Sequence, residues 1–223
     1  MARFTRLEVY QKMHNYPIVP LLSSNKIEDS LKIIKACYKG GIRVFEFTNR
    51  GDFAHEIFIE MAKYIRQNCP EMVFGIGTIL DAGTASLYIQ NGADFVICPN
   101  LVEEVAKVCN RRKIAWIPGV ATLSEISNAE ELGAEIVKLF PAQVLGSAFV
   151  KALKAPMPHT SVMATGGVEL TESSLKEWFQ AGVTCVGIGG KLISKEMLET
   201  KNFEQLTHTL SEYLKFVRDI KRK

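Results

Sequence analysis

The chain has 223 residues, 47% of them hydrophobic, and no linker, low-complexity tract or shift in composition divides it, so we predict one domain over residues 1–223 with one large core. The net charge of +3 is mild, and much of the basic excess lies in the tail 215–223, which is typical of a solvated helix end and does not favour nucleic-acid binding. No apolar run reaches the length of a membrane span, and the N-terminus has no signal-peptide core, so we expect a cytoplasmic protein without a membrane partner.

The predicted elements begin with a helix over residues 1–15, followed by eight short β-rich runs. These runs lie at residues 17–22, 42–47, 72–76, 93–97, 114–117, 134–140, 161–164 and 183–187. Apolar residues at helical spacing occupy the segments between them, as at 27–38 and 101–110, and residues 203–219 are predicted to form the last helix. Such alternation indicates parallel strands joined by crossover helices.

Glycines mark the same repeat. Gly40-Gly41, Gly92, Gly133 and Gly182 each lie between a helical segment and the next strand, where a helix C-terminus favours positive φ. Eight βα units predict an α/β fold, a single (β/α)8 TIM barrel with the extra N-terminal helix. An open doubly wound sheet is the alternative, but its first strand should lead into a glycine-rich nucleotide turn, whereas residues 23–26 read Ser-Ser-Asn-Lys.

Lys138 is a charge in an unexpected place, because it lies within the apolar run 134–140. Desolvation disfavours the charged amine and leaves a neutral nucleophile, which is what imine chemistry on a ketone requires. The structural alternative is a lysine that pairs with a carboxylate or reaches the barrel rim with its amine. Position alone does not decide between the two interpretations.

Glu46 poses the same question in the apolar run 42–47. Barrel active sites lie at the C-terminal ends of the strands, so we predict that Glu46 and Lys138 share one site. A buried glutamate would neutralise a buried lysine, and it would equally serve a Schiff-base nucleophile as a proton shuttle. Arg50 follows this run and offers bidentate hydrogen bonds, which could hold the carboxylate of an α-keto acid or orient Glu46.

Two glycine-containing groups near the C-terminus predict a phosphate site. They are Thr165-Gly166-Gly167 after the seventh strand and Gly187-Ile188-Gly189-Gly190 after the eighth. Loops seven and eight, with a short following helix, form a common phosphate cradle in barrels, and residues 191–194 would supply that helix. The run 75–78 is a weaker signal because it lacks the third glycine of a dinucleotide fingerprint.

Cysteine and histidine usage gives no metal or redox motif. The five cysteines are scattered and form no C-x-x-C pair, which is typical of reduced thiols in a reducing compartment. The four histidines form no H-x-H or H-E-x-x-H pattern that would place two ligands on one face. We expect neither a disulfide framework nor a metal site.

Six motifs together resemble the 2-keto-3-deoxy-6-phosphogluconate (KDPG) aldolase family, which also covers 4-hydroxy-2-oxoglutarate and 6-phosphogalactonate-type aldolases. They follow the family's order over about residues 17–193. They are Phe45-Glu46-Phe47-Thr48-Asn49-Arg50, Gly75-Ile76-Gly77-Thr78, residues 114–119, Val137-Lys138-Leu139-Phe140-Pro141-Ala142, Thr165-Gly166-Gly167 and Gly187-Ile188-Gly189-Gly190.

The resemblance implies a class I aldolase on a (β/α)8 barrel that needs no metal or cofactor and usually forms a homotrimer. By the same resemblance, Lys138 forms the imine, Glu46 moves protons, and Arg50 with Thr78 holds the pyruvate carboxylate. The remaining candidates are the pocket walls Phe140 and Pro99, and the residues that receive the far end of the substrate, Thr165, Gly166, Gly167, Gly189 and Gly190.

Two positions depart from the family pattern. The familiar Ser-Pro-Gly after strand four reads Cys98-Pro99-Asn100 here, and Lys191 stands where many members place a serine after the last glycine pair. A lysine attracts phosphate as a point charge but changes the hydrogen-bond geometry. We therefore keep Lys191 as a candidate phosphate contact.

The predicted reaction is cleavage of KDPG, or of its galactonate epimer, to pyruvate and glyceraldehyde 3-phosphate through an imine on Lys138. Two alternatives stay open: cleavage of 4-hydroxy-2-oxoglutarate to pyruvate and glyoxylate by the same route, and a non-catalytic barrel that only binds phosphosugars. The non-catalytic alternative leaves the desolvated pair of Glu46 and Lys138 without a purpose.

Overall fold

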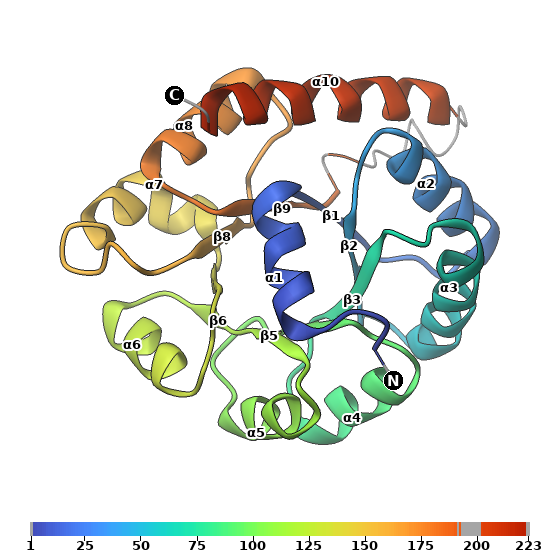
Figure 1. Ribbon diagram of the computed structural model, residues 1–223, viewed down its shortest axis with the longest axis horizontal. Helices are drawn as coiled ribbons and strands as arrows, with labels where there is room; N and C mark the ends of the chain where they lie inside the picture. The colour runs from blue at the N-terminus through green and yellow to red at the C-terminus, as the bar shows by residue number, and fades with distance from the viewer. Residues whose placement is uncertain (1, 191, 193–201, 222–223) are drawn as a thin grey trace.

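The computed structural model describes residues 2–190, 192 and 202–221 and shows a parallel β-barrel surrounded by helices (Figure 1). The strands are β1 (Ile18–Leu22), β2 (Val44–Thr48), β3 (Val73–Gly77), β4 (Phe95–Ile97), β5 (Ala115–Ile117), β6 (Gly119–Val120), β7 (Val137–Leu139), β8 (Val162–Thr165) and β9 (Cys185–Ile188). The helices are α1 (Arg6–Asn15), α2 (Ile27–Lys39), α3 (Ala54–Asn68), α4 (Ala82–Gln90), α5 (Glu103–Arg112), α6 (Leu123–Glu131), α7 (Ala142–Leu153), α8 (Glu172–Ala181) and α10 (Phe203–Lys221). The predicted alternation and fold class are confirmed.

The strand order is β5-β4-β3-β2-β1-β9-β8-β7-β6, and every pairing is parallel. Because β5 pairs with β4 while β6 pairs with β7, the short segment that joins β5 to β6 closes the sheet into a barrel. The sequence predicted one fifth strand at 114–117; the structure adds β6, separated by Pro118. Pro118 cannot donate to a ladder, but its carbonyl accepts a 2.7 Å bond from the Lys138 N–H.

Most predicted bounds agree with the structure to within a few residues. The exception is the sixth predicted strand, 134–140, of which only Val137–Leu139 is strand. The predicted helix 1–15 begins later, at Arg6, because Thr5 and Glu8 form a capping box. Positive φ is found at Gly41, Gly92, Gly133 and Gly182, as predicted for helix ends.

A separate apolar cluster fills the barrel interior. It consists of Val9, Tyr10, Met13, Val19, Val44, Val73, Phe95, Ile97, Ala115, Ile117, Ile136, Met163 and Cys185. Its first three members come from α1, which lies across one end of the barrel (Figure 1). That end is therefore closed by apolar packing, and the site must lie at the other end.

Hydrogen bonds fix α1 against the fifth βα unit. The Tyr10 hydroxyl donates to the Trp116 carbonyl (3.2 Å) and accepts from the Trp116 N–H (3.1 Å). Arg6 donates to the Ile114 carbonyl (3.1 Å) and to Asn110 Oδ1 (2.8 Å). These contacts hold α1 in place across the closed end of the barrel.

The outer helices bury the opposite faces of the strands in a second apolar cluster, in which the Phe58 and Phe74 rings stack with centroids 4.6 Å apart. The last helix, α10, packs against α2 and α8.

All five cysteines are buried free thiols. No helix in the described part of the chain has the length and apolar character to cross a membrane.

Candidate active site

The alternation of side chains along each strand places the two unexpected charges inside the barrel. Val44 belongs to the interior cluster, so Glu46, two residues later on β2, points the same way. Ile136 also belongs to that cluster, and Lys138 on β7 follows it at the same spacing. Both charges therefore lie one layer above the apolar plug, toward the C-terminal ends of the strands.

Glu46 is completely buried, and neither of its carboxylate oxygens has a hydrogen-bond partner within the described residues. Burial raises the pKa of this carboxyl, while the positive charges of Lys138 and Arg50 act in the opposite direction. A carboxyl with a raised pKa can hold and release a proton closer to neutral pH than an exposed glutamate does. An unpaired group of this kind is costly to bury and is typical of functional sites.

Gly77 makes room for that carboxylate. A Cβ built on Gly77 would lie 1.7 Å from Glu46 Oε1 and 2.6 Å from its Cδ. The sequence suggested residues 75–78 as a weak phosphate signal; the structure shows that Gly77 is in contact with Glu46 instead. Its missing side chain is a condition for the Glu46 position.

Lys138 is 5% exposed, and its Nζ lies 5.0 Å from the centroid of the Phe140 ring. Its neighbours across the sheet are Gly119 on β6 and Met163 on β8. No hydrogen bond or ion pair within 4.0 Å joins Lys138 to Glu46 among the described contacts. The two groups are close enough for the lysine to lower the pKa of the carboxyl, although no direct bond joins them.

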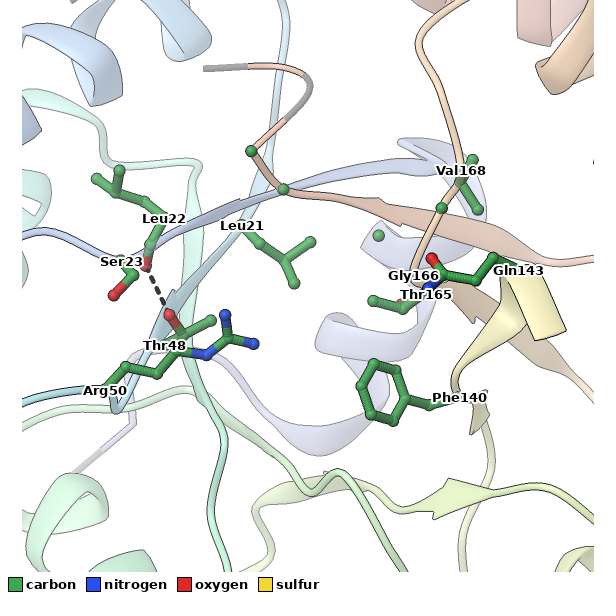
Figure 2. Close-up of a pocket in the computed structure, with 14 residues that line it drawn as sticks. Leu21, Leu22, Ser23, Thr48, Arg50, Phe140, Gln143, Thr165, Gly166 and Val168 are labelled. Carbon is green, nitrogen blue, oxygen red and sulfur yellow. Dashed lines mark hydrogen bonds between the residues drawn. The ribbon is translucent and has the colours of Figure 1, made fainter. Parts of the chain in front are cut away.

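A cavity of about 560 Å³ opens above this pair at the C-terminal ends of the strands (Figure 2). Seven of the predicted site residues line it: Arg50, Phe140, Thr165, Gly166, Gly167, Gly189 and Gly190. Thr165 is 4% exposed, and its hydroxyl has no partner in the described part of the chain. In Figure 2, Arg50 approaches the cavity from one side, and Thr165 and Phe140 approach it from the other.

Four predicted residues lie outside the lining of this cavity. Glu46 and Lys138 are deeper in the barrel, and Phe140, two residues beyond Lys138, connects the cavity to the amine. Thr78 and Pro99 are half-buried in the loops after β3 and β4. Thr78 has φ +62°, a genuine backbone outlier for a β-branched residue.

Lys191, the candidate phosphate contact that departs from the family pattern, lies outside the described residues, as does most of the expected short helix 191–194. The glycines that precede it are described and line the cavity. The described part of loop eight therefore lies at the cavity, where we expect the phosphate site.

Several lining residues were not among the predicted site residues. They are Leu21, Leu22, Ser23, Thr48, Gln143 and Val168, while Gly187 belongs to the glycine group predicted after the eighth strand. Leu21 and Thr48 share the inward parity of Val19 and Val44, which strand alternation alone would have indicated. Gln143 lies in the first turn of α7, directly after the strand that carries Lys138. Its contact with loop seven depends on tertiary packing.

The described residues contain no group of three or more His, Cys, Asp or Glu side chains placed to hold a metal ion. The charged groups assembled around the site are the carboxylate of Glu46, the amine of Lys138 and the guanidinium of Arg50. This set provides a nucleophile, a proton carrier and an anion clamp.

The chain is similar to known proteins in its sequence and in its fold. The family model described as KDPG and KHG aldolase matches residues 9–209. The 2-dehydro-3-deoxy-phosphogluconate aldolase of Dickeya dadantii is 32% identical over 195 residues, covering 86% of this chain and 87% of its own. The KDPG aldolase of Legionella pneumophila, solved with pyruvate captured as a covalent carbinolamine intermediate, superposes with a TM-score of 0.82 at 26% identity, covering 92% and 97%. The Zymomonas mobilis enzyme, solved with 3-phosphoglycerate, gives a TM-score of 0.80 at 26% identity, covering 92% and 95%.

Proposed function

Because this chain belongs to the KDPG and KHG aldolase family, we propose that it cleaves KDPG, or the galactonate epimer, to pyruvate and glyceraldehyde 3-phosphate through an imine on Lys138. The observation that carries the proposal is the buried pair of Lys138 and Glu46 inside one barrel, with a carboxylate that no group of the described residues satisfies. Two buried charges without a direct bond cost stability, and groups of this kind are concentrated at functional sites.

The proposed reaction begins when the Lys138 amine attacks the C2 ketone, and loss of water from the carbinolamine gives an iminium ion. Glu46, directly or through water, supplies and removes protons in these steps, a role that its raised pKa favours. The iminium withdraws electrons while Glu46 or its water removes the proton of the C4 hydroxyl, and the C3–C4 bond breaks. The aldehyde leaves, and the enamine on Lys138 is protonated and hydrolysed to pyruvate.

The other predicted residues take supporting roles in this proposal. Arg50 holds the carboxylate of the keto acid by paired N–H donors, with Thr78 assisting. Phe140 walls the pocket beside the reacting amine, and the half-buried Pro99 is the second proposed wall. The distal phosphate is received at loops seven and eight by Thr165, Gly166, Gly167, Gly189, Gly190 and Lys191.

Borohydride reduction in the presence of pyruvate tests the proposal. We expect a reduced pyruvyl adduct on the peptide that contains Lys138, and none in Lys138→Ala, whose kcat/KM should fall by at least about 10⁴-fold. An adduct on another lysine, or no adduct, would refute the mechanism. Pyruvate release from 4-hydroxy-2-oxoglutarate, measured beside KDPG and its galactonate epimer, ranks the substrates, and phosphosugar binding without pyruvate release would favour the non-catalytic barrel.

We also infer a homotrimer in the cytoplasm. The trimer rests on the family resemblance, and Phe53 and Leu80, which are 68% and 59% exposed, are apolar side chains that such an interface would bury. The five buried free thiols support a reducing compartment. Sedimentation equilibrium distinguishes a species of three 24.9 kDa chains from the single chain.

A further inference from the structure

Asn49 lies between the two residues that are proposed to bind the substrate carboxylate. It directly precedes Arg50, and its backbone N–H donates to the Gly77 carbonyl at 2.9 Å, one residue before Thr78. The Arg50 N–H donates to the Thr48 carbonyl at 2.9 Å, so Asn49 is the central residue of a three-residue γ-turn. The backbone of one asparagine therefore connects Arg50 on one side with Thr78 on the other.

A buried tyrosine holds the side chain of Asn49. The Tyr88 hydroxyl, from α4, donates to Asn49 Oδ1 at 2.7 Å, a normal length for an O–H···O bond. Tyr88 is 1% exposed, and its ring packs edge-on against Phe58 on α3, with the ring centroids 5.0 Å apart. Burial raises the pKa of the Tyr88 hydroxyl to about 12, so the group stays protonated and remains a donor near neutral pH.

The strained backbone of Thr78 depends on such support. Its φ of +62° is a sparsely populated conformation, and strain of this kind persists only where the surrounding structure fixes the chain. The bond from Asn49 to the Gly77 carbonyl does this directly before Thr78. The start of the γ-turn is fixed separately, because the Thr48 hydroxyl donates to the Leu22 carbonyl at 3.2 Å (Figure 2). Tyr88 therefore fixes the centre of a turn whose first residue is already held by β1.

We propose that Tyr88 is a positioning residue: through its bond to Asn49 it holds Arg50 and Thr78 in the relative position that binds the carboxylate of the keto acid. The inference rests on the proposed function, from which it takes the roles of Arg50 and Thr78. A bond that only satisfied a buried hydroxyl would affect stability alone. The two interpretations therefore differ in what the loss of the Tyr88 hydroxyl does to substrate binding.

Tyr88→Phe removes the hydroxyl and leaves the packing of the ring in place. The substrate carboxylate keeps its charge throughout the reaction, so a displaced carboxylate site weakens the binding of substrate and transition state alike. We expect KM for KDPG to rise about 10-fold, with kcat within about 3-fold of wild type.

Tyr10→Phe is the matched control for Tyr88→Phe. The Tyr10 hydroxyl is also buried and hydrogen-bonded, but to the Trp116 backbone at the closed end of the barrel. Tyr10→Phe should lower the free energy of unfolding in urea and leave KM unchanged. An unchanged KM in Tyr88→Phe, or an equal rise in Tyr10→Phe, would overturn the proposal.

Double-mutant cycles show through which residues Tyr88 acts. Asn49→Ala removes the acceptor and should raise KM by a similar factor, to which Tyr88→Phe should add less than about 2-fold. In Arg50→Ala the main carboxylate contact is already lost, so Tyr88→Phe should add less than about 3-fold there. A full 10-fold rise from Tyr88→Phe in either background would overturn the proposal.

Pyruvate binding separates this inference from the proposed reaction. In Lys138→Ala no imine forms at that position, so the NMR line width of the pyruvate methyl signal reports the carboxylate site without catalysis. Adding Tyr88→Phe should weaken pyruvate binding about 10-fold, whereas acetone, a ketone without a carboxylate, should show no difference between the two proteins. Failure of the wild type to release pyruvate from KDPG would end the proposed function alone. Equal pyruvate binding with and without Tyr88→Phe would end this inference.

Discussion

Gly77→Ala should impair the function of Glu46 without changing the Glu46 residue itself. The added Cβ would lie 1.7 Å from Glu46 Oε1, so the carboxylate must retreat by about 1.7 Å to reach ordinary contact at 3.4 Å. Gly77 has no positive φ in the structure, so alanine fits its backbone and the perturbation acts on the Glu46 side chain.

The retreat sets the size of the expected effect. Overpacking of a filled interior costs about 1–3 kcal/mol of stability. A misplacement of about 1 Å in a catalytic group costs on the order of 10²-fold in rate, and general acid–base catalysis is worth roughly 10²–10⁴-fold in all. We therefore expect kcat to fall by about 10²–10³-fold in a protein that still folds.

The assay is steady-state pyruvate release, with the free energy of unfolding measured in urea. Gly75→Ala is the matched control on the same strand and face, because its Cβ would meet the Phe95 ring at 2.3 Å instead of the Glu46 carboxylate. It should lose a similar amount of stability but less than about 5-fold in kcat. A kcat for Gly77→Ala within about 3-fold of wild type, or an equal loss in Gly75→Ala, would refute the reasoning.

A double-mutant cycle sharpens the test. Glu46→Asp shortens the side chain by one methylene and should harm the wild type. In the Gly77→Ala background it should cost less, because the shorter carboxylate avoids the new Cβ. Additive losses would show that the two residues do not act on each other.

Three more predictions follow from strained or buried groups. Burial raises the pKa of Glu46, so its contribution to stability is fully present below the unfolded pKa and is lost as pH rises through the folded pKa; Glu46→Gln should therefore melt above wild type at neutral pH, with the gap closing in acid. Thr78→Gly should relieve the backbone strain at φ +62° and stabilise the fold by about 1 kcal/mol in urea titrations, while KM for the keto acid rises. Asp94 accepts from the N–H groups of Arg3 (2.7 Å) and Phe74 (3.1 Å), so Asp94→Ala should cost about 3 kcal/mol of unfolding free energy, and a cost below about 1 kcal/mol would contradict this account.

Alternation of strands and helices was enough to predict the barrel, because each βα unit carries its own apolar pattern and its own C-terminal glycine. The split of the fifth strand was not predictable in that way. The predicted run 114–117 stops before Pro118, and the change of partner at that residue depends on where β4 and β7 lie. Closure of a barrel is a property of the whole sheet.

The candidate site was also only partly predictable from the sequence. Glu46 and Lys138 stood out because a charge within an apolar strand is visible in the sequence. Gln143 did not, since a polar residue in the first turn of a helix is ordinary until loop seven is folded against it. The role of Gly77 was also not visible, because the sequence does not show that a carboxylate from β2 occupies the space beside it.

The contacts of α1 with residues 110–116 also bear on how the chain assembles during synthesis. This helix leaves the ribosome before its partners, which follow about a hundred residues later, and a ten-residue helix is only marginally stable alone. The first four βα units must therefore form, or stay unfolded, while α1 does not yet cover its end of the barrel. Helix α1 is thus made before the strands but docks only after the fifth of them, and any pause before residue 116 would leave apolar strand ends exposed to chaperones or to other chains.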